Sequence, residues 1–297
     1  MIGEVLALCA ALCWTISAVL YREALIDVKP ILANTIRCIG TSMFIMTILA
    51  LTGGFKVLIS LPAHVIMLAC VSGLVGLGFG DTLYLLSLEV IGVSRAVPIT
   101  CSYPLFNIIF ASLLEGEKVE WQIILAAVAI VAGIWLLSYN SNNSEMAMKG
   151  RDLVKGVSAA IATAILWSIS ISLVNIAVNE ASNLQQIFAI NSVRVVFLMS
   201  LLIIITVLTG KKINFINMDW KNIARLSAGG IIALGLGWFL LALSLIYIPE
   251  TQAVPISSTT PLFSAIAGAL FLHEKVTFNV IVGSAVIVLG VALIFMA

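Results

Sequence analysis

The feature that most constrains this chain is a series of ten apolar runs, each about as long as a lipid bilayer is thick. A helix needs about 20 apolar residues to cross a hydrocarbon layer of about 30 Å. The runs cover residues 3–21, 31–51, 65–88, 96–114, 121–139, 154–176, 187–208, 226–247, 253–272 and 277–296. Backbone polar groups inside a bilayer must be satisfied within the spanning segment, and no run shows a strand pattern. The sequence therefore predicts an all-α polytopic membrane protein with ten transmembrane helices.

Composition excludes the main alternatives to a membrane protein. Only 10% of the 297 residues are charged, whereas soluble domains contain roughly 25%. A soluble enzyme, a disordered chain and a secreted disulfide scaffold are thereby excluded, and the net charge of +1 argues against a nucleic-acid partner. The five cysteines lie in apolar runs without metal-binding spacing, so we expect free thiols, no metal and no cofactor.

The chain contains an internal repeat. When the sequence is shifted by 157 residues, 26 of 66 positions are identical between residues 73–138 and 230–295. We therefore expect a first five-helix repeat over residues 1–140, a polar linker over 141–153 and a second five-helix repeat over 154–297. Because five spans is an odd number, the second repeat enters the membrane in the opposite orientation. This inverted topology is typical of secondary transporters, and the alternative is a gene duplication without transport.

Several matched motifs resemble those of a known family. Trp14 and Trp167 lie in the first helix of each repeat, and Arg37 and Arg194 lie early in the second. Both repeats also contain Ala-Val-Pro-Ile, Pro-Leu-Phe and Glu-Lys-Val in the same order. With these motifs the chain resembles the EamA family of the drug/metabolite transporter superfamily. The resemblance implies secondary transport, often export and often proton-coupled, of substrates that range from amino acids and sugars to drugs and lipid-linked sugars.

The orientation in the membrane stays open at this point. Eleven of the fifteen Lys and Arg residues lie in the connections after the odd-numbered spans. The positive-inside rule then places both termini outside. The resemblance implies termini inside, as in many relatives. In either case we expect a multi-pass protein of the plasma (inner) membrane.

Two charged residues within the spans mark a candidate polar cavity. Intramembrane charges are costly and commonly functional. Arg37 and Asp81 lie roughly 10 Å below the same membrane surface at 1.5 Å per helical residue, and Tyr103 can reach that layer. We predict that these three residues line one substrate cavity, with Asp81 as the proton-coupling group. The alternative is a static Arg37–Asp81 ion pair with a structural role only.

The second repeat lacks a matching carboxylate, because Trp238 takes the place of Asp81 under the repeat shift. Arg194 is then available for a carboxylate or phosphate of the substrate. The alternative is that Arg194 snorkels to the interface or bonds backbone carbonyls. Asn34 and Asn191 lie one turn before the two arginines and can assist either role.

Aromatic and hydroxyl side chains extend the candidate site. Trp14 and Trp167 lie near the middle of their spans, where they form either aromatic walls for a solute or ordinary packing. Four prolines mark candidate helix breaks: Pro98, Pro104, Pro255 and Pro261. Hydroxyl groups beside them either bind a polar solute or repair the interrupted helix; we include Thr100, Ser258 and Thr260 in the substrate-binding set.

Glycine patterns predict close helix contacts. The run from Gly76 to Gly80 has the wrong spacing for a nucleotide-binding loop and favours helix packing. Gly133 and Gly290 would let the fifth and tenth spans pack against another helix or a second subunit, as in a homodimer.

We therefore predict a secondary active transporter, exporting a small polar or amphipathic metabolite such as an amino acid. A flippase for a lipid-linked sugar is the first alternative, and a non-transport membrane scaffold or receptor is the second. An enzyme is not expected, because no nucleophile, paired-carboxylate or metal-protease pattern is present.

Overall fold

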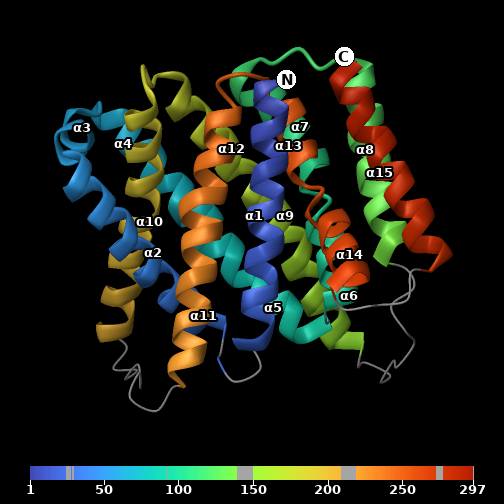
Figure 1. The fold of residues 1–297 in the computed structure, drawn as a ribbon, viewed down its shortest axis with the longest axis horizontal. Coiled ribbons are helices and arrows are strands. Elements are labelled where there is room, and N and C mark those ends of the chain that lie inside the picture. Colours follow the sequence, from blue (N-terminus) through green and yellow to red (C-terminus); the bar gives the residue numbers. More distant parts are fainter. Residues whose placement is uncertain are drawn as a thin grey trace.

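The computed structural model describes residues 1–24, 28, 30–91, 93–138, 150–208, 219–271 and 277–296. Over these residues the chain is helical and contains no strand. The helices of the first repeat are α1 (Ile2–Ala24), α2 (Pro30–Thr52), α3 (Phe55–Ser60), α4 (Ala63–Ser72), the π-helix η1 (Gly73–Gly80), α5 (Asp81–Ile91), α6 (Val93–Thr100), α7 (Tyr103–Glu115) and α8 (Trp121–Ser138). Those of the second are α9 (Gly150–Asn179), α10 (Leu184–Leu208), α11 (Trp220–Gly230), the π-helix η3 (Ile231–Gly237), α12 (Trp238–Ser244), α13 (Glu250–Ser257), α14 (Thr260–Phe271) and α15 (Phe278–Met296). Figure 1 shows the long helices side by side in one bundle.

The helices are long and apolar enough for a multi-pass membrane protein. Eight helical segments among the described residues can each cross a bilayer. Two of these, Ala63–Ile91 and Trp220–Ser244, consist of an α-helix, a π-helix and a second α-helix in series. Helix α8 contributes a shorter apolar segment, and α13 and α14 form an interrupted pair. The all-helical polytopic fold class is confirmed, and the count of ten spans stays a prediction.

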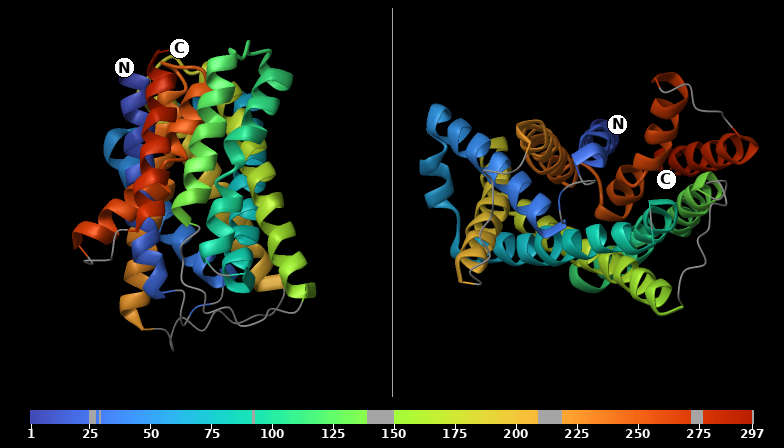
Figure 2. Two further views of the ribbon diagram at one scale, coloured as in Figure 1. Left: turned by 90° about the vertical axis from the view of Figure 1, so that its right-hand side faces the viewer. Right: turned by 90° about the horizontal axis from the view of Figure 1, so that it is seen from below.

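The first helices of the two repeats run in opposite directions. Gly3, at the start of α1, packs against Ile248. Asn179, at the end of α9, lines a cavity with the same Ile248. One helix therefore begins where the other ends, as the inverted repeat predicts. Both chain termini lie at this end of the bundle (Figures 1 and 2), which we call the terminus side.

The two repeats pack together through glycines. Each glycine contacts the helix of the other repeat that carries its arginine, which is α2 for Arg37 and α10 for Arg194. A Cβ atom on Gly73 would lie 2.7 Å from the carbonyl oxygen of Arg194, and one on Gly230 would lie 2.6 Å from that of Arg37. Such distances leave no room for a side chain. Each repeat's third span therefore packs directly on the arginine-bearing helix of the other repeat.

These contacts predict a position-specific effect of adding one methyl group. Gly230→Ala is expected to lower the free energy of unfolding by about 1–3 kcal/mol, because the backbone of α2 must move. Gly235→Ala is the matched control, since its new Cβ would meet only the Thr41 methyl group at 3.7 Å. Unfolding of both purified variants in detergent checks the prediction, and equal losses would contradict it.

Helices α8 and α15 lie along each other through their small residues. A Cβ atom on Gly133 would lie 2.7 Å from the Gly283 carbonyl oxygen, and one on Gly290 would lie 3.0 Å from that of Ala126. The two glycines that suggested a homodimer through the fifth and tenth spans thus pack within one chain. The homodimer itself stays a prediction.

Candidate functional site

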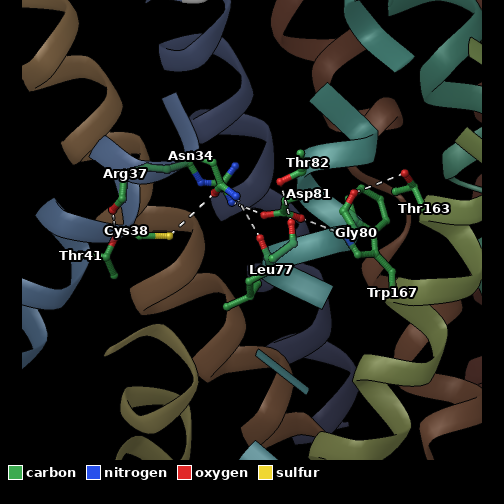
Figure 3. A network of polar contacts seen from close by, with 11 residues as sticks. Asn34, Arg37, Cys38, Thr41, Leu77, Gly80, Asp81, Thr82, Thr163 and Trp167 are labelled. Carbon is green, nitrogen blue, oxygen red and sulfur yellow. Dashed lines mark hydrogen bonds and ion pairs between the residues drawn. The ribbon is translucent and has the colours of Figure 1, made fainter. Parts of the chain in front are cut away.

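A buried ion pair lies where the first repeat meets the second. Arg37 extends from α2, and Asp81 begins α5 directly after η1. The Arg37 guanidinium donates through Nη2 to Asp81 Oδ2, and Trp167 of α9 donates its Nε1–H to Asp81 Oδ1 at 2.9 Å (Figure 3). Both charged residues are only 6% exposed. The carboxylate of Asp81 is therefore held by one donor from each repeat.

Arg194 occupies the equivalent place in the second repeat but has a different environment. It is 0% exposed, so the predicted alternative that it snorkels to the interface is wrong. Its guanidinium carbon lies 4.1 Å from the ring centroid of Trp238. Its terminal nitrogens donate to Ser170 Oγ at 3.3 Å and to Asn191 Oδ1 at 3.5 Å.

The buried charges of this region do not balance. Within the described residues Arg194 forms no ion pair with a carboxylate at 4.0 Å or less, and its Nε has no hydrogen-bond partner. Asp81 pairs directly with Arg37 instead. Two buried guanidinium groups thus accompany one carboxylate, so the formal charge of Arg37, Asp81 and Arg194 together is positive.

The π-helices explain the two asparagines and the glycine run. A π-helix disturbs the regular hydrogen-bond ladder and frees carbonyl groups. Asn34 Nδ2 donates to the carbonyl of Leu77 at 3.0 Å, and Asn191 Nδ2 donates to that of Leu234 at 2.9 Å. The same bond thus recurs in both repeats at the repeat shift. Asn34 and Asn191 stabilise η1 and η3, and Asn191 also accepts from Arg194.

The tryptophan in the first helix of each repeat packs against a helix of the other repeat. Trp167 lies so close to Gly80, and Trp14 so close to Gly237, that a Cβ on either glycine would be 2.9 Å from the indole. Trp14 also packs edge-on against Trp238, with ring centroids 5.7 Å apart. Both indoles remain partly accessible. The close-packing interpretation of the glycines therefore holds, and each tryptophan lies beside the arginine site of the opposite repeat.

Tyr103 reaches the ion pair only through Trp167. The two rings are 5.9 Å apart in an edge-to-face arrangement, and the Tyr103 hydroxyl lies 3.3 Å from Ser257 Oγ. Tyr84 also packs against this indole, with ring centroids 5.1 Å apart. Tyr103, predicted beside Asp81 and Arg37, is thus in a second layer behind Trp167.

The helix interruptions follow two of the predicted prolines rather than coinciding with them. Pro98 lies inside α6 and Pro255 inside α13, whereas Pro104 and Pro261 lie in the first turns of the helices that follow. The neighbouring hydroxyls bond to nearby backbone carbonyls. The donors and acceptors are Thr100 to Val97 at 3.0 Å, Ser258 to Pro255 at 2.7 Å and Thr260 to Ala11 and Ser257 at 3.4 Å each. Thr100 and Ser258 therefore bond within the helical turn beside each proline, and Thr260 also links α14 to α1. Binding of a polar solute by these hydroxyl groups stays a prediction.

Sequence reasoning missed a buried polar cluster at the terminus side. It contains Glu115, Glu250 and the amides of Asn107 and Asn175, which bond to the two carboxyl groups. Glu115 and Glu250 each fell one to three residues outside a predicted span, so they were not treated as intramembrane charges. Their shared proximity to span boundaries was the signal available in the sequence.

Comparison with known proteins identifies the family. The model of the EamA-like transporter family matches residues 1–139 and 154–296. This chain belongs to the EamA-like transporter family. Its predicted resemblance is thereby confirmed, and the matched residues cover both repeats.

One relative of this EamA-family chain extends over its full length, and another covers about two thirds of it. A protein described as an uncharacterized transporter of Archaeoglobus fulgidus is 25% identical over 296 residues, which are 100% of this chain and 99% of the relative. Another uncharacterized transporter, from Clostridium kluyveri, is 26% identical over 66% of this chain and 61% of its own length. A solved structure superposes with a TM-score of 0.78 at 18% identity, covering 99% of this chain and 96% of that one. The last comparison supports the fold, and the family makes this protein an integral multi-pass membrane transporter.

Proposed function

We propose that this EamA-family protein is a secondary active exporter of a small polar or amphipathic metabolite that carries a carboxylate, such as an amino acid. The observation that carries this proposal is the complete burial of Arg194 without an acidic partner among the described residues. An isolated buried charge costs several kcal/mol. A substrate carboxylate would balance Arg194, and a guanidinium can bind it through two parallel hydrogen bonds.

The aromatic surroundings favour a substrate with an apolar or cationic part as well. Trp14, Trp167 and Tyr84 are all only partly buried among these helices, and Trp238 already stacks on Arg194. Indole faces attract ammonium groups and pack well against apolar ones. An amino acid offers an anionic group for Arg194 and an ammonium group for the aromatic faces.

The contacts between the repeats couple their movements, as alternating access requires. Inverted repeats open a site to opposite sides by exchanging their conformations. Because Gly73 packs on the backbone of Arg194 and Gly230 on that of Arg37, movement of one repeat displaces the arginine helix of the other. Substrate binding to Arg194 would therefore favour a different arrangement of both repeats.

Transport by proteoliposomes tests the substrate class. Entrance counterflow would be measured for amino acids, organic cations and nucleosides, and flipping for a lipid-linked sugar. We expect saturable flux of carboxylate-bearing solutes. Flux of organic cations alone, or movement of the lipid-linked sugar alone, would overturn the proposal, and the second result would support the flippase.

The proposed coupling group is Asp81, which is tested separately. In the described conformation Arg37 and Trp167 both donate to its carboxylate, and such bonds favour the ionised form. Asp81 can take up a proton once Arg37 is withdrawn. Asp81→Asn is therefore expected to retain substrate counterflow but to lose acceleration by a pH gradient. Glu120→Gln, at an exposed loop position, is the control, and unchanged gradient dependence in Asp81→Asn would disprove this role.

A further inference from the structure

Two glutamates from different repeats meet at the terminus side. Glu115 is the last residue of α7, in the first repeat, and Glu250 is the first residue of α13, in the second. Glu250 bonds to Ser172 and Glu115 bonds to Asn175, and these two donors are neighbours on one face of α9, so the two carboxyl groups lie close together. Two ionised carboxylates at close range repel each other, and one proton shared between them relieves that repulsion. We call Glu115 and Glu250 the glutamate pair.

Neutral side chains from α7 and α9 hold the glutamate pair in place. Glu250 Oε1 accepts from Asn107 Nδ2 and from Ser172 Oγ, the latter at 2.6 Å. Glu115 Oε2 accepts from Asn175 Nδ2 at 2.5 Å. Glu250 and Asn107 are both 0% exposed, and Asn175 is 2% exposed. The cluster is thus built into the protein interior where α7, α9 and α13 meet.

The cluster has more acceptors than donors. Four of its oxygens are buried and have no hydrogen-bond partner among the described residues: Glu115 Oε1, Glu250 Oε2, Asn107 Oδ1 and Asn175 Oδ1. A buried acceptor without a donor costs about 1–3 kcal/mol. The two amides point at the glutamate pair through their nitrogens, so their unpartnered oxygens lie beside it. This arrangement favours a positively charged ligand among these oxygens.

A cavity on the terminus side borders the cluster at Asn175. It has a volume of about 330 Å³, and its lining includes Asn175, Glu117, Tyr247 and Pro249. Asn175 both lines the cavity and bonds to Glu115. Water in the cavity therefore lies one side chain away from the glutamate pair.

The repeat symmetry does not require this cluster. In the sequence, the repeat shift pairs Glu115, Glu250 and Asn107 with Leu272, Val93 and Ser264. The two carboxyl groups and the amide are therefore not repeated at the equivalent sequence positions. An inverted repeat makes the two ends alike in backbone, so a difference in charge between them distinguishes the two sides for a bound ion.

We propose that the glutamate pair is a proton-binding gate that takes its proton from the terminus side and holds α7 against α13. A proton from water in the cavity binds one carboxylate oxygen, which changes the charge of the pair from −2 to −1. Release of that proton to the same water leaves two carboxylates that repel each other and separate the helices. This gate is distinct from Asp81 and does not depend on the substrate class.

A proton fits the site better than a metal ion. A proton shared by two carboxyl groups needs only two oxygens, whereas a hard metal cation needs a larger set of oxygen ligands. Among the described residues there is no group of three or more His, Cys, Asp and Glu side chains that could hold a metal.

The other charged groups described near the glutamate pair either bond to a partner or are exposed. Glu117 accepts the backbone N–H groups of the first two residues of α13, at 2.9 and 3.2 Å, which places its charge at a helix N-terminus. Glu4 of α1 pairs with the amino terminus at 2.6 Å. The exposed titratable groups nearby are Lys118, Glu120, Tyr247 and the His64–Glu180 pair.

Infrared difference spectra of the purified full-length protein between about pH 5 and pH 9 test for the shared proton. Wild type, Asp81→Asn and Glu117→Gln are expected to show a protonated-carboxyl band that disappears at high pH. The double variant Glu115→Gln/Glu250→Gln is expected to lack it, and in Glu250→Gln alone it is expected to vanish at lower pH. Persistence of the band in the double variant would overturn the proposal. Suppression of the band by NaCl but not by choline chloride would also overturn it, because Na⁺ would then be the ligand.

Hydrogen–deuterium exchange tests the gating step. After correction for intrinsic pH dependence, protection of α7 and α13 is expected to fall at high pH in wild type and in Asp81→Asn. In Glu250→Gln and in the double variant it is expected to stay constant, because no second carboxylate is present to repel. Protection that is independent of pH in wild type would overturn the gate.

Discussion

Replacing Arg194 with Gln is expected to weaken substrate binding roughly 10- to 100-fold, the effect of losing hydrogen bonds to a charged group. The same change is not expected to lower the free energy of unfolding. Gln removes a buried charge that has no acidic partner among the described residues, and that gain offsets the lost stacking on Trp238. Counterflow and thermal unfolding of the same preparation measure the two effects.

The matched control is the equivalent arginine of the first repeat. Arg37→Gln removes the partner of Asp81 and leaves a buried carboxylate with Trp167 as its remaining donor. This variant is expected to be clearly less stable than wild type, whereas Arg194→Gln is not. Equal losses of stability in the two variants would contradict the conclusion that Arg194 is unbalanced in the substrate-free protein.

Replacing Asp81 with Ala is expected to lower the free energy of unfolding by about 3–5 kcal/mol, the usual cost of breaking a buried ion pair from one side. Two guanidinium groups would then share a region without a carboxylate. The Trp167 indole would also lose its acceptor. Unfolding of the detergent-solubilised variant measures this loss.

A double-mutant cycle separates the ion pair from simple packing. Arg37→Leu in the Asp81→Ala background removes the unpaired charge, so the double variant is expected to recover part of the lost stability. The coupling energy should lie within about 0.5–3 kcal/mol. Additive losses would show that Arg37 and Asp81 do not act as a pair.

The repeat is the part of this protein that its sequence predicts best. Proline, arginine and asparagine recur at one fixed shift, so the pairs Arg37/Arg194 and Asn34/Asn191 place equivalent positions in both repeats. The substitution of Trp238 for Asp81 is also visible in the sequence alone, and it identifies Arg194 as the unbalanced charge. Depth along a helix follows from residue counting, which is why Arg37 and Asp81 were expected at one level.

The contacts that individual side chains make between helices could not be predicted from the sequence. Residue counting gives depth but not the rotation of a helix, so Trp167 was not expected to donate to Asp81, nor Ser170 to interact with Arg194. The π-helices likewise have no propensity signal; their glycines indicated packing alone. Glu250 was not predicted as a buried charge because span boundaries are uncertain by several residues. Its neighbour in the cluster, Glu115, also lies far away in sequence.

The most direct test of the central claim compares each amino acid with its own amide as a ligand of the purified protein. The two molecules share every group except the carboxylate that Arg194 is proposed to bind. A ligand at one hundred times its dissociation constant stabilises the native state by about 2.7 kcal/mol, which a thermal unfolding curve detects. We expect at least one free acid to raise the melting temperature, its amide to have little effect, and Arg194→Gln to abolish the difference. Equal stabilisation by an acid and its amide, or a shift that survives in Arg194→Gln, would contradict the proposal that Arg194 binds the substrate.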